Sequence, residues 1–194
     1  MELLEKKILS DGKVAAGDVL NVSRFLNHMV DVDLLQELGT EFCRLFADCG
    51  ITKILTVEAS GIGLACFTAL GLHVPVLYAK KSKTKNINAH VYSAMAHSYT
   101  HGNDNLLCVD TEYLLSSDKV LIVDDFLATG CALNALIDII GQAGAELVGI
   151  GIAVEKVYQN GGNELRKKGI RVESLARVTA LDENGVTFAA EGTD

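Results

Sequence analysis

The chain has 194 residues, of which 49% are hydrophobic and 22% charged, and its formal net charge at pH 7 is −8. A chain of this length usually builds one well-buried core, so we expect residues 1–194 to form a single domain. The acidic balance argues against a nucleic-acid partner, which favours a basic excess. No apolar run is long enough to cross a bilayer, so we expect no membrane partner.

The start of the chain and the cysteines indicate a cytoplasmic protein. MELLEKKILSDG alternates acidic and basic residues and lacks the apolar core and small-residue cleavage site of a secretory signal. The cysteines form no CxxC pair and no zinc-binding spacing; they are Cys43, Cys49, Cys66, Cys108 and Cys131. Four of them have apolar neighbours, so we expect reduced and mostly buried thiols.

The first third of the chain predicts helical and extended segments. Residues 2–10 are expected to form a short helix, and residues 13–26 strands around a Gly-Asp turn. A longer helix is predicted from Asp33, because Asp33 and Gln36 resemble a capping pair and apolar residues follow at helical spacing. Gly50 is the predicted end of that helix.

From residue 53 onward, strands and helices alternate. Strands are predicted at 53–59, 74–80, 91–100, 105–114, 119–125, 145–157 and 171–182, and helices at 61–71, 129–143 and 161–169. The polar, basic stretch 80–90 is predicted to be a mobile loop. This alternation predicts an α/β fold with a doubly wound, mainly parallel sheet flanked by helices. Ligands bind such sheets at the carboxyl ends of strands, which here means the loops after Val57, Lys80 and Val123.

Residues 120–136, VLIVDDFLATGCALNAL, combine a buried strand with two acids and a turn. Neighbouring strand residues point to opposite faces, so Asp124 and Asp125 are not both expected to be ordinary solvent-exposed charges. In the alternative, one carboxylate caps the next helix and the other is solvated. Thr129 and Gly130 precede that helix, and a Gly-bearing turn at a helix N-terminus presents N–H groups to an anion. Acids beside an anion site favour a ligand with hydroxyls and a phosphate, such as a phosphorylated ribose.

Two further segments could bind phosphates. The SGIG turn at 60–63 could be half of a dinucleotide fingerprint, but Cys66 replaces its third glycine. It could also be an ordinary strand-to-helix turn, or a pyrophosphate loop in which Gly61 lets the backbone approach the phosphates. A basic segment follows, and it is either a solvated loop or a positive lid over pyrophosphate; its lysines are Lys80, Lys81, Lys83 and Lys85.

VLIVDDFLATGCA resembles the phosphoribosyl-pyrophosphate signature of type I phosphoribosyltransferases, and the resemblance covers residues 15–182. VEASGIGLA (57–65) resembles the family's pyrophosphate loop, and KKSKTKNINAHVYS (80–93) its flexible catalytic loop. The bacterial xanthine phosphoribosyltransferases are the most similar members. The resemblance implies the fold predicted above, with a small hood formed by N- and C-terminal segments, and a homodimer.

The resemblance also implies a role for each motif. Asp124 and Asp125 would hold the ribose hydroxyls, directly or through Mg²⁺, and no residue is assigned as a direct metal ligand. Lys81 would act in catalysis from the lid. The 5′-phosphate would bind at Ala128, Thr129, Gly130, Cys131 and Ala132, and pyrophosphate at Ala59, Ser60 and Gly61. Xanthine would bind at Leu20, Asn27 and Lys156, although Lys156 could equally form an ion pair at the strand end beside Glu155.

Two positions depart from the family pattern. Related hypoxanthine-guanine enzymes carry an acid where this chain has Ala128, and the loop commonly ends in Thr or Ser rather than Ala132. Either another group accepts the purine proton, or the purine arrives already ionised, which suits the acidic oxopurine xanthine. Alternatives are another purine (guanine, hypoxanthine or adenine) and a non-catalytic sensor of phosphoribosyl pyrophosphate. Residues 1–32, before the first long predicted helix, are too few for a DNA-reading module of such a sensor.

Overall fold

The computed structural model describes residues 1–15, 19–82, 90–96, 105–182 and 185–190. In chain order its elements are α1 (Glu2–Asp11), β1 (Lys13–Ala15), β2 (Val19–Asn21), the π-helical turn η1 (Ser23–Asn27), α2 (Val32–Phe46), β3 (Lys53–Val57), α3 (Gly61–Leu72), β4 (Val76–Ser82), β5 (Val91–Ala96), β6 (Asn105–Asp110), β7 (Lys119–Leu127), α4 (Cys131–Ala143), β8 (Glu146–Lys156), the 3₁₀ turn η2 (Val157–Gln159), α5 (Gly161–Lys167), β9 (Val172–Asp182) and β10 (Gly185–Phe188).

Eight strands form one large sheet in the order β10-β9-β8-β7-β3-β4-β6-β5. The five central strands, β9 to β4 in that order, run parallel. At the edges, β10 pairs antiparallel with β9, and β6 pairs antiparallel with both β4 and β5. The predicted α/β fold with a mainly parallel sheet is therefore confirmed, because the strand–helix–strand crossovers impose parallel pairing.

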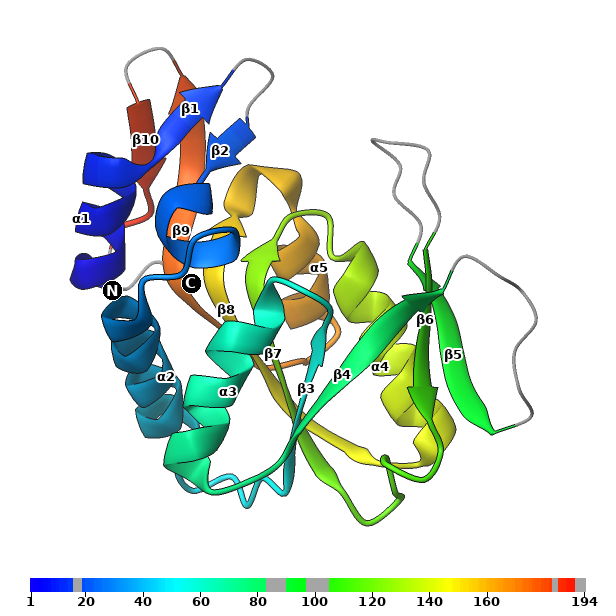
Figure 1. Cartoon of the computed structure of the whole chain (residues 1–194). Helices are drawn as coiled ribbons and strands as arrows, with labels where there is room; N and C mark the ends of the chain where they lie inside the picture. Colours follow the sequence, from blue (N-terminus) through cyan, green and yellow to red (C-terminus); the bar gives the residue numbers. More distant parts are fainter. Residues whose placement is uncertain (16–18, 83–89, 97–104, 183–184, 191–194) are drawn as a thin grey trace.

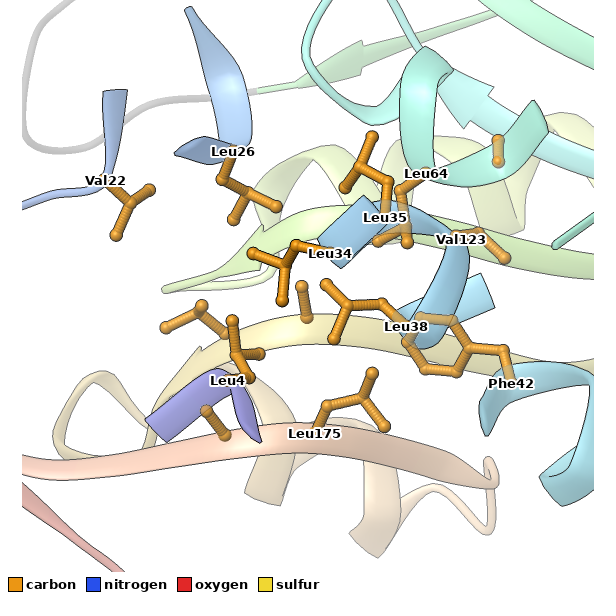
Figure 2. Packing of buried hydrophobic residues seen from close by; sticks show 14 of the residues in the cluster. Leu4, Val22, Leu26, Leu34, Leu35, Leu38, Phe42, Leu64, Val123 and Leu175 are labelled. Carbon is orange, nitrogen blue, oxygen red and sulfur yellow. The ribbon is translucent and has the colours of Figure 1, made fainter. Parts of the chain in front are cut away.

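Helices cover both faces of the sheet (Figure 1). One apolar cluster joins α1, α2 and α3 to the sheet and includes Leu4, Leu38 and Val123, as Figure 2 shows. A second cluster joins α4 and Leu165 of α5 to the opposite face. Each fully buried aliphatic or aromatic side chain contributes about 1.5–3 kcal/mol to folding by its removal from water, so these clusters hold the layers together.

The glycines of β8 make room for α2. A Cβ at Gly149 would lie 2.7 Å from the ring of Phe46, and one at Gly151 would lie 2.9 Å from the ring of Phe42. Glycine inside a strand often marks such a close approach. The run GIGIAV therefore lets two fully buried phenylalanines of α2 lie directly on the sheet.

Both ends of the described chain contribute to a hood at one end of the molecule (Figure 1). Strands β1 and β2 form a separate antiparallel pair, and β10 lies beside β9. Helix α1 contacts β9 and β10, and the amino group of Met1 donates to the backbone oxygen of Leu175. The hood predicted from the family resemblance is thus present.

The predicted bounds of α2 were wrong at both ends. The N-cap is Asp31 rather than Asp33, because Asp31 has extended backbone angles and its side chain accepts from the Leu34 N–H at 3.1 Å. The helix ends at Phe46, before the predicted stop at Gly50. Gly50 has a φ of +64°, so it turns the chain within the loop that leads to β3.

Three further expectations need correction. Strand β4 continues past its predicted end at Lys80 and includes Lys81, which was predicted to lie in the loop, because β4 pairs with β6 beyond the end of its apolar run. The thiols are free as expected, but Cys66 is exposed and the other four are partly exposed rather than buried. Residues 23–27 form a helical turn instead of a strand, and the predicted Gly-Asp turn at residues 17 and 18 lies outside the described residues.

Within the described part of the chain, no helix combines the length and the apolar character needed to cross a membrane.

Candidate active site

The candidate site lies where the winding of the sheet changes direction. Strands β3 and β7 are neighbours, but α3 follows β3 on one face while α4 follows β7 on the other. A crevice opens at such a switch point, beyond the carboxyl ends of the strands. It contains a pocket of 220 Å³, lined by Val57, Glu58, Ser60, Lys81, Ala96, Asn105, Leu107, Asp124, Asp125, Cys131 and Ala132.

The acid pair is buried at this crevice. Asp124 and Asp125 are only 7% and 6% exposed, and both line the pocket. Asp125 accepts hydrogen bonds from Ser60 Oγ at 3.0 Å and from Asn27 Nδ2 at 3.2 Å. Helix α4 is capped by Gly130, so the alternative of one capping and one solvated acid is wrong.

The two carboxylates are electrostatically unfavourable neighbours. Burial and the charge of Asp125 raise the pKa of Asp124 well above its ordinary value, and the positive charge of Lys81 opposes this rise. The backbone N–H of Asp125 donates to Asp124 Oδ1 at 3.0 Å, which supports the ionised form but does not outweigh the burial. A ligand that brings hydroxyl donors or a cation would therefore stabilise this pair.

The predicted pyrophosphate turn lies directly beside the acids. Ser60 binds Asp125, and α3 starts at the next residue, Gly61. A Cβ on Gly61 would lie 2.2 Å from Thr56 Oγ1 and 2.6 Å from Asp124 Oδ1. Glycine is required here because the start of α3 touches both side chains.

Replacement of Gly61 by Ala is expected to lower kcat/KM of the phosphoribosyl transfer that the family resemblance implies at least tenfold, because the new methyl group displaces the Asp124 carboxylate. The overpacking also lowers the free energy of unfolding by about 1–3 kcal/mol. The matched control is Gly141→Ala on α4, where the new Cβ has no neighbouring atom within 4 Å. Steady-state kinetics and thermal unfolding of both variants check this. Equal losses in the two variants would contradict a specific role for Gly61.

The second turn, residues 128–132, joins β7 to α4. Gly130 has a φ of +81°, which favours glycine, and the first turn of α4 leaves backbone N–H groups with no intrahelical acceptor. Cys131 and Ala132 line the pocket, and Cys131 Sγ lies 3.1 Å from Thr129 Oγ1. The Ala128 oxygen accepts from the N–H of Gly161 at 3.1 Å. The turn can therefore hold an anion beside the acid pair.

The three predicted purine-binding residues lie in different places. Asn27 ends η1 and donates to Asp125, so it belongs to the acid-pair network. Leu20 is 5% exposed and packs in the apolar cluster of α1 to α3. Lys156 ends β8, with its ammonium 5.8 Å from the Phe126 ring centre, within cation–π range. None of the three lines the 220 Å³ pocket.

Glu155, the alternative partner predicted for Lys156, forms an ion pair with Arg166. Glu155 is fully buried, and its two carboxylate oxygens accept from Arg166 at 2.7 and 2.8 Å. Burial acts to raise the pKa of Glu155, but its ion pairs with Arg166 and Arg177 outweigh that effect and hold the pKa below its ordinary value. Neighbouring strand residues point to opposite faces, so Lys156 is directed away from this network.

The basic segment is only partly described. Lys81 lines the pocket, and its backbone N–H donates to Glu58 Oε1 at 2.6 Å. Lys83 and Lys85, which the lid prediction also included, lie outside the described residues.

Sequence reasoning missed two residues that shape the site. Glu58 follows β3, lines the pocket and anchors the backbone of Lys81. Gly161 supports the 128–132 turn from α5; the Gly-Gly dipeptide after β8 was the available signal, since paired glycines often mark close backbone contacts.

Comparison with known proteins agrees with this geometry. Residues 41–176 match the phosphoribosyl transferase domain, and the chain belongs to that family. Curated relatives resemble it along its whole length. A xanthine phosphoribosyltransferase of Bacillus cereus is 47% identical, covering 100% of this chain and 98% of the relative, and one of Lacticaseibacillus casei is 49% identical, covering 98% and 100%.

Solved structures confirm the fold. Adenine phosphoribosyltransferase of Trypanosoma brucei, in complex with AMP, pyrophosphate and ribose-5-phosphate, aligns with a TM-score of 0.76 at 18% identity, over 98% of this chain and 86% of that one. The Giardia lamblia enzyme, complexed with 9-deazaadenine, aligns with a TM-score of 0.76 at 21% identity, over 91% and 98%. At these identities the likeness concerns the fold and not the purine.

Proposed function

We propose that this protein transfers the 5-phosphoribosyl group of phosphoribosyl pyrophosphate to xanthine, giving xanthosine 5′-monophosphate and pyrophosphate in purine salvage. Family membership and whole-chain similarity identify a glycosyltransferase-type enzyme. The proposal is carried by two buried carboxylates at one crevice beside the turns at 60–63 and 128–132, in a chain that matches xanthine phosphoribosyltransferases from end to end.

Each part of the sugar substrate has a matching group. The carboxylates of Asp124 and Asp125 accept hydrogen bonds from the ribose hydroxyls. The N–H groups of residues 128–132 bind the 5′-phosphate, and those of residues 59–61 bind pyrophosphate. A purine nitrogen then forms a bond to C1 as the bond from C1 to the pyrophosphate oxygen breaks. Positive charge develops on the ribose ring in this step, and the buried carboxylates stabilise it.

Lys81 supplies positive charge where negative charge accumulates. As the bond to C1 breaks, pyrophosphate gains negative charge, and Lys81 at the pocket wall stabilises it. The hydrogen bond from its backbone to Glu58 keeps this end of β4 beside the SGIG turn.

Mg²⁺ is the proposed cofactor. Among the described residues no group of three or more His, Cys, Asp or Glu could hold a metal, so the protein does not form a complete cation site by itself there. Mg²⁺ commonly binds through one or two carboxylates together with substrate phosphates, and the acid pair fits that role. When bound, Mg²⁺ neutralises charge on the leaving pyrophosphate.

The purine half of the proposal rests on Lys156, Asn27 and Leu20. Lys156 donates to the 6-oxo group of xanthine, while Leu20 of β2 and Asn27 of η1 close over the base. Ala128 offers no acid to accept the purine proton. An oxopurine that has already lost a proton removes that need, and xanthine is the most acidic of the common oxopurines.

We also propose a cytoplasmic location and a homodimer. Five free cysteines suit a reducing compartment, in which disulfides are rare. The homodimer rests on the family resemblance, and sedimentation equilibrium checks it.

The test is a set of parallel assays with phosphoribosyl pyrophosphate, Mg²⁺ and each of xanthine, guanine, hypoxanthine and adenine. Nucleotide formation is followed by absorbance. Xanthine is expected to give the highest kcat/KM, and its kcat/KM should rise with pH as the free purine ionises. Preference for another base would overturn the xanthine assignment. Binding of phosphoribosyl pyrophosphate without turnover of any base would indicate the sensor instead.

A further inference from the structure

Helix α5 lies against the turn predicted to hold the 5′-phosphate, although it follows that turn by some thirty residues. The N–H of Gly161 donates to the Ala128 oxygen at 3.1 Å. A Cβ on Gly161 would lie 2.3 Å from that oxygen and 2.7 Å from the Gly130 nitrogen. The start of α5 is therefore in van der Waals contact with the backbone of the turn, and only glycine fits there.

A second contact joins the other end of α5 to the same turn. Lys168, immediately after the helix, donates to Asn134 Oδ1 at 3.0 Å. Asn134 Nδ2 in turn donates to the Gly130 oxygen at 2.9 Å. One carbonyl of the turn is thus held by Gly161 and another, through Asn134, by Lys168.

Helix α5 is itself fixed to the sheet by a buried ion pair. Arg166 makes a two-pronged contact with Glu155 and donates to the Val172 oxygen at 3.2 Å. A Cβ on Gly162 would lie 1.9 Å from Glu155 Oε1, so glycine is needed beneath this pair as well. A bidentate Arg–carboxylate contact adds geometric specificity, so this pair fixes the orientation of α5 on the sheet.

We propose that α5 is a positioning element for phosphoribosyl-pyrophosphate binding, with Gly161 and Lys168 as the positioning residues that hold the 128–132 turn in its anion-binding shape. The inference rests on the proposed function, because that function assigns the 5′-phosphate to this turn. Neither residue contacts the pocket, so they act through the turn alone.

The test compares Lys168→Met and Gly161→Ala with two matched controls. Lys167→Met removes a neighbouring exposed lysine whose partner is Glu164 within the same helix. Gly141→Ala places a methyl group on α4 with no atom within 4 Å. The measured quantities are KM for phosphoribosyl pyrophosphate, KM for xanthine, kcat, and the dissociation constant of phosphoribosyl pyrophosphate with Mg²⁺ by calorimetry.

Lys168→Met is expected to raise KM and the dissociation constant for phosphoribosyl pyrophosphate about threefold to tenfold, as the loss of one orienting hydrogen bond does. KM for xanthine and the unfolding temperature should stay close to those of the wild type, because the side chain is exposed. Gly161→Ala should raise the same constants by at least about tenfold, since the turn itself must move. Both controls should match the wild type.

Three outcomes are decisive. Equal rises in both Michaelis constants, or a fall in kcat alone, would overturn the positioning role, as would a Lys168→Met enzyme identical to Lys167→Met. If Gly161→Ala does not fold, Lys168→Met still tests the positioning role of α5, because removal of an exposed side chain leaves the core intact. An inactive wild-type protein would instead contradict the proposed function.

Discussion

Asp125→Asn is expected to lower kcat/KM by a factor of about 10² to 10³, the loss typical when one pre-oriented electrostatic group is removed from an active site. The carboxylate loses the negative charge that binds the ribose hydroxyls and balances the positive charge on the ring. The fold should survive, because asparagine has nearly the same shape. Its Oδ1 can accept from Asn27, and its amide can donate to the Ser60 hydroxyl, which now binds Asp125 at 3.0 Å.

Asp138→Asn is the matched control for this variant. Asp138 lies exposed on α4, so the same loss of one charge should leave kcat/KM unchanged. Circular dichroism of both variants checks the fold, and initial rates with xanthine check activity. Wild-type turnover by Asp125→Asn would remove the acid pair from the proposed mechanism.

The parts of the fold that local pattern determines were predicted from the sequence. Apolar runs followed by helical periodicity placed β3, α3, β7 and α4 in order, and strict alternation implied parallel pairing. The acid pair and the Thr-Gly turn were also recognisable, because strand ends of a parallel sheet meet at one edge. The burial of the two acids, at a pocket that Cys131 and Ala132 also line, follows from that topology.

What the sequence did not reveal depends on contacts between distant segments. The strand was predicted to end at Lys80 and Lys81 was predicted to lie in a loop, but pairing with β6 extends β4 through Lys81. Asp31 and Asp33 are equally good caps by composition, and only the backbone angles of Asp31 decide between them. Gly161 supports a turn that precedes it by some thirty residues, and no local rule connects the two.

Asp124→Asn is expected to make the protein more stable while it lowers activity. Asp124 is buried beside Asp125, and this burial together with the charge of Asp125 raises its folded-state pKa well above the ordinary value of 3.8. Between those two values the folded state binds more protons than the unfolded state, so the free energy of unfolding falls as pH rises through that window. Below the ordinary pKa this cost is absent. Above the raised pKa it is fully present and no longer changes.

Asparagine removes this cost and can still accept the Asp125 N–H through its own Oδ1. We expect a gain of about 1 kcal/mol at pH 7, and a midpoint of thermal unfolding about 2–4 °C higher. The gain over the wild type should shrink as pH is lowered towards 4. Activity should fall by about 10² or more, as for any residue whose charge binds the transition state.

Asp118→Asn is the control, and we expect it to change the free energy of unfolding at pH 7 in the opposite direction. Asp118 is also buried, but its pKa is lowered, because hydrogen bonds from Lys53, the Leu115 N–H and Thr52 outweigh the effect of burial. The contact with Lys53 is 2.6 Å, so loss of this charge should destabilise the protein at pH 7. Unfolding curves of both variants between pH 4 and 8 decide the matter. If Asp124→Asn were destabilised like Asp118→Asn, the acid pair would be a structural element rather than a strained binding site.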